Sequence, residues 1–233
     1  MPDFFVFFKP RDIVSGDFYW VREVDNKICA IVADCTGHGV PGAFMSMLGI
    51  SFLNEIIRKK EITQANQILD ELRKEIKTTL GQTGKMDEQK DGMDMALCVI
   101  NKKTKEMEYA GANNALYIIR NSSPDGDNKW AWEIIKLKPD RQPIGIYMKE
   151  IPFTNHRFQL KSKDRIYMAS DGFIDQFGGQ NSQRFKTKRY DEFLLSIQNK
   201  SIEQHKELFE KKFVYWKGEN PQIDDILILG IQI

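Results

Sequence analysis

The sequence predicts an α+β fold in which antiparallel sheets pack together with helices on their outer faces. Short apolar segments separated by turn residues are typical of strand hairpins, whereas the helical segments come in pairs rather than singly between strands. Because single β-α-β units do not describe this order, antiparallel sheets are expected rather than a parallel one. No internal repeat, low-complexity linker or shift in composition divides the chain. Residues 1–233 are therefore interpreted as one domain.

The N-terminal part of the chain is expected to contain three strands, at residues 4–8, 17–24 and 27–33. The last two form a hairpin about the turn Asp25-Asn26. The strand at 27–33 is apolar on both faces, which predicts a central, buried position. Pro41 fits the first turn of a helix. An amphipathic helix follows, with apolar residues at three- and four-residue steps: Phe44, Met47, Leu48, Phe52 and Ile56.

A second helix is expected across residues 65–80, with the apolar stripe Ile68, Leu69, Leu72, Ile76 and Leu80. Residues 81–92 are polar and glycine-flanked, which indicates a loop. Strands are then expected at 95–100, 106–109, 116–120, 132–137 and 165–169, with a long polar loop at 121–129. Residues 173–188 are glycine-rich and polar. Helices at 190–197 and 203–213 and a strand at 226–233 complete the chain.

The composition excludes several classes of function. Apolar residues make up 41% of the 233 residues, charged residues 29%, and the formal net charge is +1. These values are ordinary for a globular protein and give no long-range positive field, so no nucleic-acid partner is expected. The three cysteines, Cys29, Cys35 and Cys98, form an odd count without CxxC spacing, which argues against a disulfide framework or a zinc site and favours a reducing compartment.

The same reasoning predicts a cytoplasmic protein without direct membrane contact. No apolar run approaches the ~18 residues of a membrane span. The start, Met1-Pro2-Asp3-Phe4, lacks the basic region and cleavage site of a secretory signal. Attachment to a membrane through a missing part of a longer protein stays open, and the chain would then be the cytoplasmic domain of a membrane-bound sensor.

Four aspartates lie where an apolar strand ends or a glycine turn begins: Asp17, Asp34, Asp171 and Asp224. Carboxylates delivered to strand ends from distant parts of a chain indicate convergence on hard cations, which prefer oxygen ligands. Taken singly, each has a simpler explanation as a turn residue, a helix cap or a charged strand start. Taken together, carboxylates that converged without a cation would repel one another.

Two other motifs suggest different chemistry and are not favoured. The segment 37–42 matches GxGxxG, with the acidic residue Glu61 about 20 positions beyond, as in dinucleotide-binding proteins. Two helices and a loop follow it before the next strand, and Asp34 would repel a pyrophosphate. No cysteine has an arginine six positions later, which excludes a thiolate phosphatase. The triplet Asp125-Gly126-Asp127 resembles an aspartyl-nucleophile motif, but it lies in a polar loop and is interpreted as a surface turn.

A set of motifs appears in a fixed order along the chain: Lys9-Pro10, Ser15-Gly16-Asp17-Phe18-Tyr19-Trp20, Ala33-Asp34-Cys35-Thr36-Gly37-His38-Gly39-Val40-Pro41-Gly42, Asp91-Gly92-Met93-Asp94, Ala110-Gly111-Ala112-Asn113-Asn114, Gln142-Pro143-Ile144-Gly145, Ser170-Asp171-Gly172-Phe173 and Asp224-Asp225. This ordered set resembles a known family, the SpoIIE-type serine/threonine phosphatases, which are the bacterial branch of the metal-dependent protein phosphatases (PPM). The resemblance spans essentially the whole chain and implies an α-β-β-α sandwich of two antiparallel sheets flanked by helix pairs.

The resemblance implies two Mn²⁺ or Mg²⁺ ions. Asp34 would bridge both ions, and the main-chain carbonyl of Cys35 would bind the second. Asp171 and Asp224 would hold the first ion, whereas Asp17 would bind the second, directly or through water. Catalysis would depend on Asp34 and Asp171 through a metal-bound water. Asp175 matches a position that helps to bind a third, weaker ion in some relatives.

Two family features have no secure match. In the wider family a histidine two positions after the bridging aspartate is a proposed general acid, but this chain has Thr36 there. His38 lies four positions after Asp34, and it is interpreted as a buried brace of the glycine turn in preference to a general acid. For the arginine that grips phosphate in the wider family, Arg11 is only a nearby candidate.

The implied function is hydrolysis of phosphoserine or phosphothreonine on a partner protein, commonly a STAS-domain anti-anti-sigma factor in a partner-switching pathway. The chain could be the C-terminal catalytic part of a longer sensor protein or a stand-alone effector with an external regulator, and a homodimer is possible. The alternative is a non-catalytic regulatory module of the same fold that binds its partner without metal.

Overall fold

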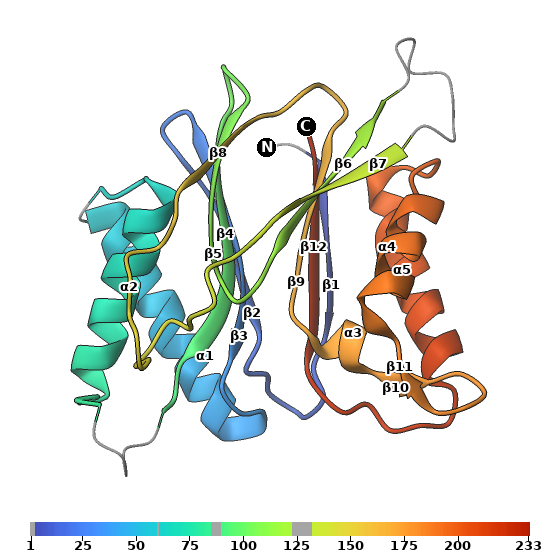
Figure 1. The fold of residues 1–233 in the computed structure, drawn as a ribbon, viewed down its shortest axis with the longest axis horizontal. Helices are drawn as coiled ribbons and strands as arrows, with labels where there is room; N and C mark the ends of the chain where they lie inside the picture. The colour runs from blue at the N-terminus through green and yellow to red at the C-terminus, as the bar shows by residue number, and fades with distance from the viewer. Residues whose placement is uncertain (1–2, 60, 85–89, 123–131) are drawn as a thin grey trace.

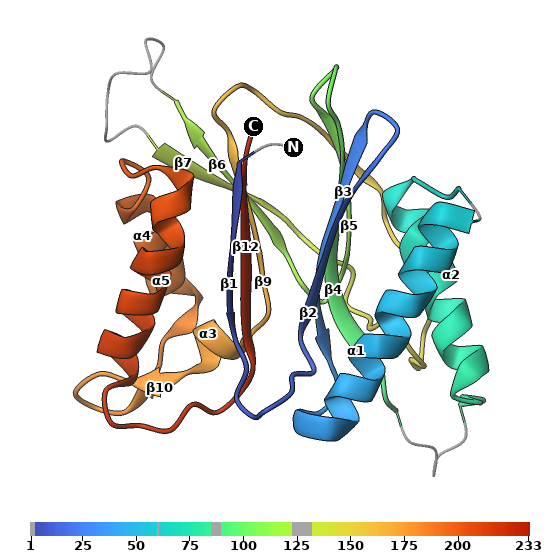
Figure 2. The ribbon, with the colours of Figure 1, turned by 180° about the vertical axis from the view of Figure 1, so that it is seen from behind.

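The protein is a four-layer sandwich of two sheets between two pairs of helices (Figure 1). The computed structural model describes residues 3–59, 61–84, 90–122 and 132–233. Two five-stranded antiparallel sheets face each other, and each carries helices on its outer side, as Figure 2 shows from behind. The predicted α+β sandwich is therefore confirmed. The triplet at 125–127 lies outside the described residues.

One sheet has the strand order β2-β3-β4-β5-β8. Its strands are β2 (Phe18–Val24), β3 (Lys27–Cys35), β4 (Met93–Asn101), β5 (Glu106–Ala112) and β8 (His156–Gln159). The hairpin β2–β3 is as expected from the sequence. β3 lies between β2 and β4, and its residues 28–33 are all buried, which confirms its predicted inner position. Because β3 pairs antiparallel with β4, the glycine segment that follows β3 does not belong to a β-α-β unit.

The other sheet has the order β1-β12-β9-β6-β7. Its strands are β1 (Phe4–Lys9), β12 (Ile226–Gln232), β9 (Arg165–Ala169), β6 (Leu116–Asn121) and β7 (Trp132–Leu137). The glycine-rich, polar segment at 173–188, to which the sequence assigned no helix or strand, contains most of a short helix, α3 (Gly172–Asp175), and a small hairpin of β10 (Phe177–Gly178) and β11 (Gln183–Arg184). A strand of two residues is too short to show a periodic pattern in the sequence, and its pairing depends on tertiary contacts.

Helix pairs cover the outer faces. α1 (Gly39–Asn54), the π-helical turn η1 (Glu55–Lys59) and α2 (Ala65–Thr79) lie on the sheet of β3, and α4 (Lys186–Ser196) and α5 (Ile202–Lys217) lie on the sheet of β12 (Figure 2). The predicted stripe of α2 is buried except for Leu80. On α5, Phe209 stacks against Phe5 and Phe7 of β1.

The apolar stripe predicted for the first half of α1 is wrong. Phe44 and Met47 are each 68% exposed, whereas Gly42, Ser46 and Gly49 are buried. The small residues face the protein because the segment before β2 packs closely against them. Hydrophobic periodicity cannot detect such a face, since it counts large apolar side chains.

The continuous helix formed by α1 and η1 spans 21 residues from Gly39 to Lys59 and is long and apolar enough to cross a membrane by length and composition alone. The sequence expectation concerned an unbroken apolar run, whereas this helix includes polar residues such as Ser46, Asn54 and Glu55. Core helices meet the same criterion. In this fold the helix packs on a sheet, and Leu53, Ile56 and Ile57 are buried.

Candidate functional site

The four predicted aspartates come together at one end of the sandwich. Asp17 directly precedes β2, Asp34 is the penultimate residue of β3, Asp171 follows β9, and Asp224 lies just before β12. A cleft of about 370 Å³ opens there. It is lined by Asp34, Cys35, Thr36, Gly37, His38, Asp94, Asp171 and Asp224. Asp17 is only 4% exposed, and its negative charge raises the pKa of Asp34.

Strand pairing fixes the position of Asp34 and adds Asp94 to the site. In the β3–β4 register Asp34 lies opposite Asp94. Beyond this pair, the Thr36 main-chain N–H donates to the Gly92 carbonyl at 2.9 Å, and the Gly92 N–H donates to the Thr36 hydroxyl at 3.1 Å. Asp94 accepts a hydrogen bond of 2.8 Å from the Asn113 side-chain amide. The motif around Asp94 was recognised in the sequence, but no role in the site was assigned to this residue.

The glycine segment after β3 lets two loops approach each other closely. Gly37 has φ 83° and Gly39 φ 64°, conformations that favour glycine. A Cβ atom on Gly42 would overlap the carbonyl oxygen of Gly37 and press on Gly16. The Ser46 hydroxyl donates to the Gly16 carbonyl at 2.6 Å. The GxGxxG pattern therefore serves close packing, which brings the segment before Asp17 against the start of α1.

A buried carboxylate, Asp225, holds the N-terminal segment in place. It is 2% exposed, and its two oxygens accept the main-chain N–H groups of Arg11 at 2.7 Å and Gly16 at 2.8 Å. Gly172 packs directly against the carbonyl of Asp225, so no side chain fits there. This contact places the neighbours of these residues, Asp17, Asp171 and Asp224, around one cleft. From the sequence, only Asp224 of this pair was expected to have a role, because nothing in Asp224-Asp225 indicates which carboxylate points inward.

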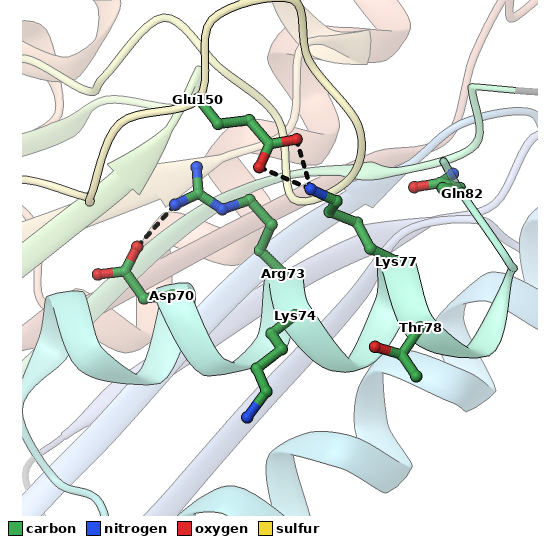
Figure 3. Close-up of a pocket in the computed structure, with 7 residues that line it drawn as sticks. All are labelled: Asp70, Arg73, Lys74, Lys77, Thr78, Gln82 and Glu150. Carbon is green, nitrogen blue, oxygen red and sulfur yellow. Dashed lines mark hydrogen bonds and ion pairs between the residues drawn. The ribbon is translucent and has the colours of Figure 1, made fainter. Parts of the chain in front are cut away.

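A second set of contacts holds the loop that supports Asp94. Ile144 pairs with Met93, the residue before Asp94, through main-chain hydrogen bonds of 3.0 and 2.8 Å. Farther along this loop, α2 provides anchors (Figure 3). The Arg73 guanidinium donates to Asp70, Gln142 and the Ile151 carbonyl, and Lys77 pairs with Glu150 at 2.7 Å. The sequence showed the motif at 142–145 but not the buried arginine that binds it.

The carboxylates raise one another's pKa. Burial is the main cause that raises the pKa of Asp17 to about 8, and the charges of Asp225 and Asp224 add to it. Burial, then the charges of Asp17 and Asp171, raise the pKa of Asp34 to about 9. Burial, then the charge of Asp224, raises the pKa of Asp171 to about 6. The principal influences on these pKa values include no positively charged side chain, so a bound cation would stabilise the ionised site.

The residues present fit a centre for hard divalent cations. The Oδ2 atom of Asp17 is buried and has no hydrogen-bond partner among the residues that the structure describes, as expected for a carboxylate with a ligand role. Within the same residues no three histidine, cysteine, aspartate or glutamate side chains form a ready-made cluster. An ion would therefore also need main-chain carbonyl or water oxygens, which suits Mg²⁺ or Mn²⁺.

Cys35 can offer such an oxygen but not a thiolate. Its side chain is buried beside Ser46, whose hydroxyl lies 3.8 Å from the sulfur, and burial raises the pKa of the thiol well above its ordinary value. The main-chain carbonyl is the donor left for a cation. Asp175, considered for a third ion, forms an ion pair of 3.1 Å with Arg184, and its charge also raises the pKa of Asp171.

His38 is not the buried brace that the sequence suggested. Its side chain is 48% exposed, lines the cleft, and makes a hydrogen bond of 2.8 Å from Nδ1 to the Asp12 carboxylate. Arg11 is exposed, and its guanidinium donates to the Ile223 carbonyl at 3.0 Å. It is not among the residues that line the cleft, so the sequence candidate for a phosphate anchor is not placed at the site.

Residues 24–233 match the family model of stage II sporulation protein E (SpoIIE). The chain belongs to the SpoIIE family. This assignment agrees with the SpoIIE-type phosphatase resemblance found in the sequence motifs, and it covers three of the four aspartates, because Asp17 precedes the matched range. A search of curated proteins finds no match.

Solved structures support the SpoIIE assignment. The SiaA-PP2C domain of Pseudomonas aeruginosa is 30% identical over 99% of this chain and 85% of that chain, with a TM-score of 0.85. The PP2C phosphatase domain of SpoIIE from Bacillus subtilis, with a fragment of its regulatory domain, is 18% identical with a TM-score of 0.75. The RsbU and RsbW domains of a Mycobacterium tuberculosis protein are 17% identical, also with a TM-score of 0.75. This chain spans 63% and 60% of the last two structures, which show the shared fold alone.

Proposed function

We propose that this SpoIIE-family chain is a metal-dependent protein phosphatase that hydrolyses phosphoserine or phosphothreonine on a partner protein. The observation that carries the proposal is the cluster of carboxylates with mutually raised pKa values at an open cleft, together with the orphaned oxygen of Asp17. Such a cluster is costly to the fold, and costly clusters of this kind are expected at functional sites. The relationship to PP2C phosphatase domains supports this choice of chemistry.

Each residue of the site would have a separate role in binding the ions. Asp34 lies centrally and would contact both of two Mn²⁺ or Mg²⁺ ions, with Asp171 and Asp224 on one side and Asp17 and the Cys35 carbonyl on the other. When bound, such ions supply an activated water and neutralise phosphate charge. The chain's own contribution is to fix these oxygens in advance: β3, β9 and β12 deliver three of them, and the Asp225 hydrogen bonds fix the segment before Asp17.

The cleft suits a phosphate carried on a protein. It opens to solvent and is lined mainly by short polar side chains, so a phosphorylated loop could enter it without a deep pocket for a small molecule. A phosphocysteine intermediate is not part of the proposal, because Cys35, which lines the cleft, has a buried thiol with a raised pKa.

A STAS-type regulator in a partner-switching pathway is the proposed substrate, with an upstream sensor or regulator. Solved relatives from the RsbU–RsbW protein and from work on the bacterial stressosome support this class of partner. A cytoplasmic site of action and a homodimer belong to the same proposal. The magnesium complex of RsbX, at 13% identity, supports a divalent ion only through the shared fold.

The proposal is tested with Asp34→Asn and Asp171→Asn, each assayed for hydrolysis of an aryl phosphate and a phosphoserine peptide with Mn²⁺ and with chelator. We expect hydrolysis in the unmodified chain that chelation abolishes, and a loss on the order of 10²-fold or more in both variants. The matched control is Asp25→Asn, in the exposed β2–β3 turn at the far end of the hairpin. An unmodified chain that binds its partner but hydrolyses nothing would instead support the non-catalytic regulatory module.

A further inference from the structure

The first half of α1 exposes large apolar side chains to solvent. Val40 is 62% exposed, and Phe44 and Met47 are each 68% exposed. They follow one another at steps of four and three residues, so they share one face of the helix. Surface helices usually place charged residues on the solvent side, but none of the residues of α1 from Gly39 to Asn54 is charged. This face is therefore both apolar and electrically neutral.

The segment between β1 and β2 extends this apolar face. Ile13 is fully exposed, and Val14 is also exposed. Asp12, just before them, makes a hydrogen bond of 2.8 Å to the residue that precedes α1, and the Ser15 carbonyl accepts one of 3.2 Å from the Ser46 hydroxyl. Figure 2 shows this segment beside the start of α1. The exposed apolar residues of both parts form one surface, which we call the apolar ridge: Ile13, Val14, Val40, Phe44 and Met47.

The apolar ridge adjoins the cleft. His38 lines the cleft and is the residue before α1, so Val40 lies just beyond the edge of the cleft. A helix rises about 1.5 Å per residue, which places Met47 only about 10 Å farther along its axis. Within the described part of the chain, the residues that line the cleft include no large apolar side chain. A protein seated at the cleft therefore has to make its apolar contacts outside it.

The size of a protein interface makes the apolar ridge part of any such contact. A stable interface buries about 800 Å² on each partner, which is more surface than a phosphorylated loop in the cleft covers. Most of the binding energy comes from a few large side chains near the middle of the interface, and aromatic residues and methionine are enriched there. The apolar ridge provides Phe44 and Met47 at this position, beside the point where the phosphate would enter.

We propose that the apolar ridge is the docking surface for the phosphoprotein substrate, and that it selects substrates with apolar residues close to the phosphorylated serine or threonine. This inference rests on the proposed phosphatase activity and describes the partner surface that the same site accepts. An extended chain advances about 3.3 Å per residue, so side chains about two to five positions from the phosphorylated residue reach the ridge. Because the ridge lies outside the cleft, it acts on substrate binding and not on the chemical step.

The test uses two synthetic phosphoserine peptides of equal length and charge. One carries leucine at several positions within this reach on each side of the phosphoserine, and the other carries serine at the same positions. A third substrate, p-nitrophenyl phosphate, is too small to contact the ridge. With Mn²⁺ we expect the unmodified chain to prefer the leucine peptide by about tenfold in kcat/KM.

Phe44→Ser and Met47→Ser should each lose most of this preference through a higher KM for the leucine peptide. Hydrolysis of the serine peptide and of p-nitrophenyl phosphate should not change. The matched control is Tyr215→Ser, which removes an 83% exposed aromatic side chain from α5 on the other sheet and should keep the preference. Thermal unfolding of each variant shows that its fold is kept.

A leucine preference that is absent in the unmodified chain, or that persists in both Phe44→Ser and Met47→Ser, would overturn the role of the apolar ridge and leave the phosphatase proposal standing. An equal loss on p-nitrophenyl phosphate would overturn it too, because the substitution would then act on the metal centre. A dimer that Phe44→Ser converts to a monomer with its peptide preference unchanged would assign the ridge to a contact between copies. If the unmodified chain hydrolyses none of the three substrates with Mn²⁺ or Mg²⁺, the phosphatase proposal fails and this inference fails with it.

Discussion

The metal-free protein should lose stability steadily as the pH rises from about 5 to 8. The pKa of Asp17 is raised from 3.8 to about 8 and that of Asp34 from 3.8 to about 9, in both cases mainly by burial. Between pH 3.8, the ordinary pKa of an aspartate in the unfolded chain, and the raised pKa values of about 8 and about 9, Asp17 and Asp34 keep their protons in the folded chain but lose them in the unfolded chain. Stability is therefore greatest at the acidic end of the range and is lost as the pH rises through the folded pKa values.

The size of the effect follows from the number of protons held. Each retained proton changes the free energy of unfolding by about 1.4 kcal/mol per pH unit, so Asp17 and Asp34 together give about 2.7 kcal/mol per unit. For a chain of this length about 1 kcal/mol corresponds to 2–4 °C in Tm, which makes the fall about 5–11 °C per unit. Asp34→Asn removes one titrating group, so its slope should be about half as steep.

The assay is urea or thermal unfolding of the chelated protein across this pH range, for the unmodified chain, Asp34→Asn and the control Asp25→Asn. Mn²⁺ at about 100 times its Kd should restore about 2.7 kcal/mol to the unmodified chain and less to Asp34→Asn. A stability that does not change between pH 5 and 8, or an equal slope in Asp34→Asn, would refute the conclusion that burial and mutual repulsion raise the pKa values of Asp17 and Asp34.

Three further substitutions test the supports of the site. Gly42→Ala should destabilise the fold by about 1–3 kcal/mol and reduce metal-dependent hydrolysis, since its Cβ would overlap the Gly37 carbonyl; unchanged urea unfolding would contradict the close packing. Arg73→Met should cost about 3–5 kcal/mol, because it removes a buried guanidinium that binds Gln142 and an ion-pair partner, as Figure 3 shows in part. Lys77→Met breaks a more exposed ion pair and should cost at most about 1 kcal/mol, so equal effects on Tm would argue against this difference.

Much of the fold could be predicted because it depends on local patterns. The apolar run of β3 and the stripe of α2 indicated their burial correctly, and the turn at Asp25-Asn26 indicated the first hairpin. The first half of α1 could not be predicted in this way, because it packs through glycine and serine. The structure brings Asp34, Asp171 and Asp224 to one cleft with Asp17 beside Asp34, because each lies near a strand end at the same edge of the sandwich, and their role as metal ligands stays a prediction.

The rest of the site depends on pairing across long sequence separations. Asp94 enters the cleft through its register with Asp34, which a single sequence does not specify. Asp225 holds the N-terminal segment because its carboxylate accepts hydrogen bonds from the main-chain N–H groups of Arg11 and Gly16, which lie more than 200 positions earlier in the sequence. His38 was recognised as a candidate, but its partner Asp12 had no signal, because the two meet only when the segment before β2 folds over the start of α1.

The place of β12 has a consequence for the order in which the protein matures on the ribosome. β12 lies between β1 and β9, and the Asp225 carboxylate just before it reaches a main-chain group 214 positions earlier. A nascent chain that lacks residues 224–232 leaves β1 and β9 without the strand between them. The cleft, which Asp224 lines, can therefore form only after this strand has emerged from the ribosome.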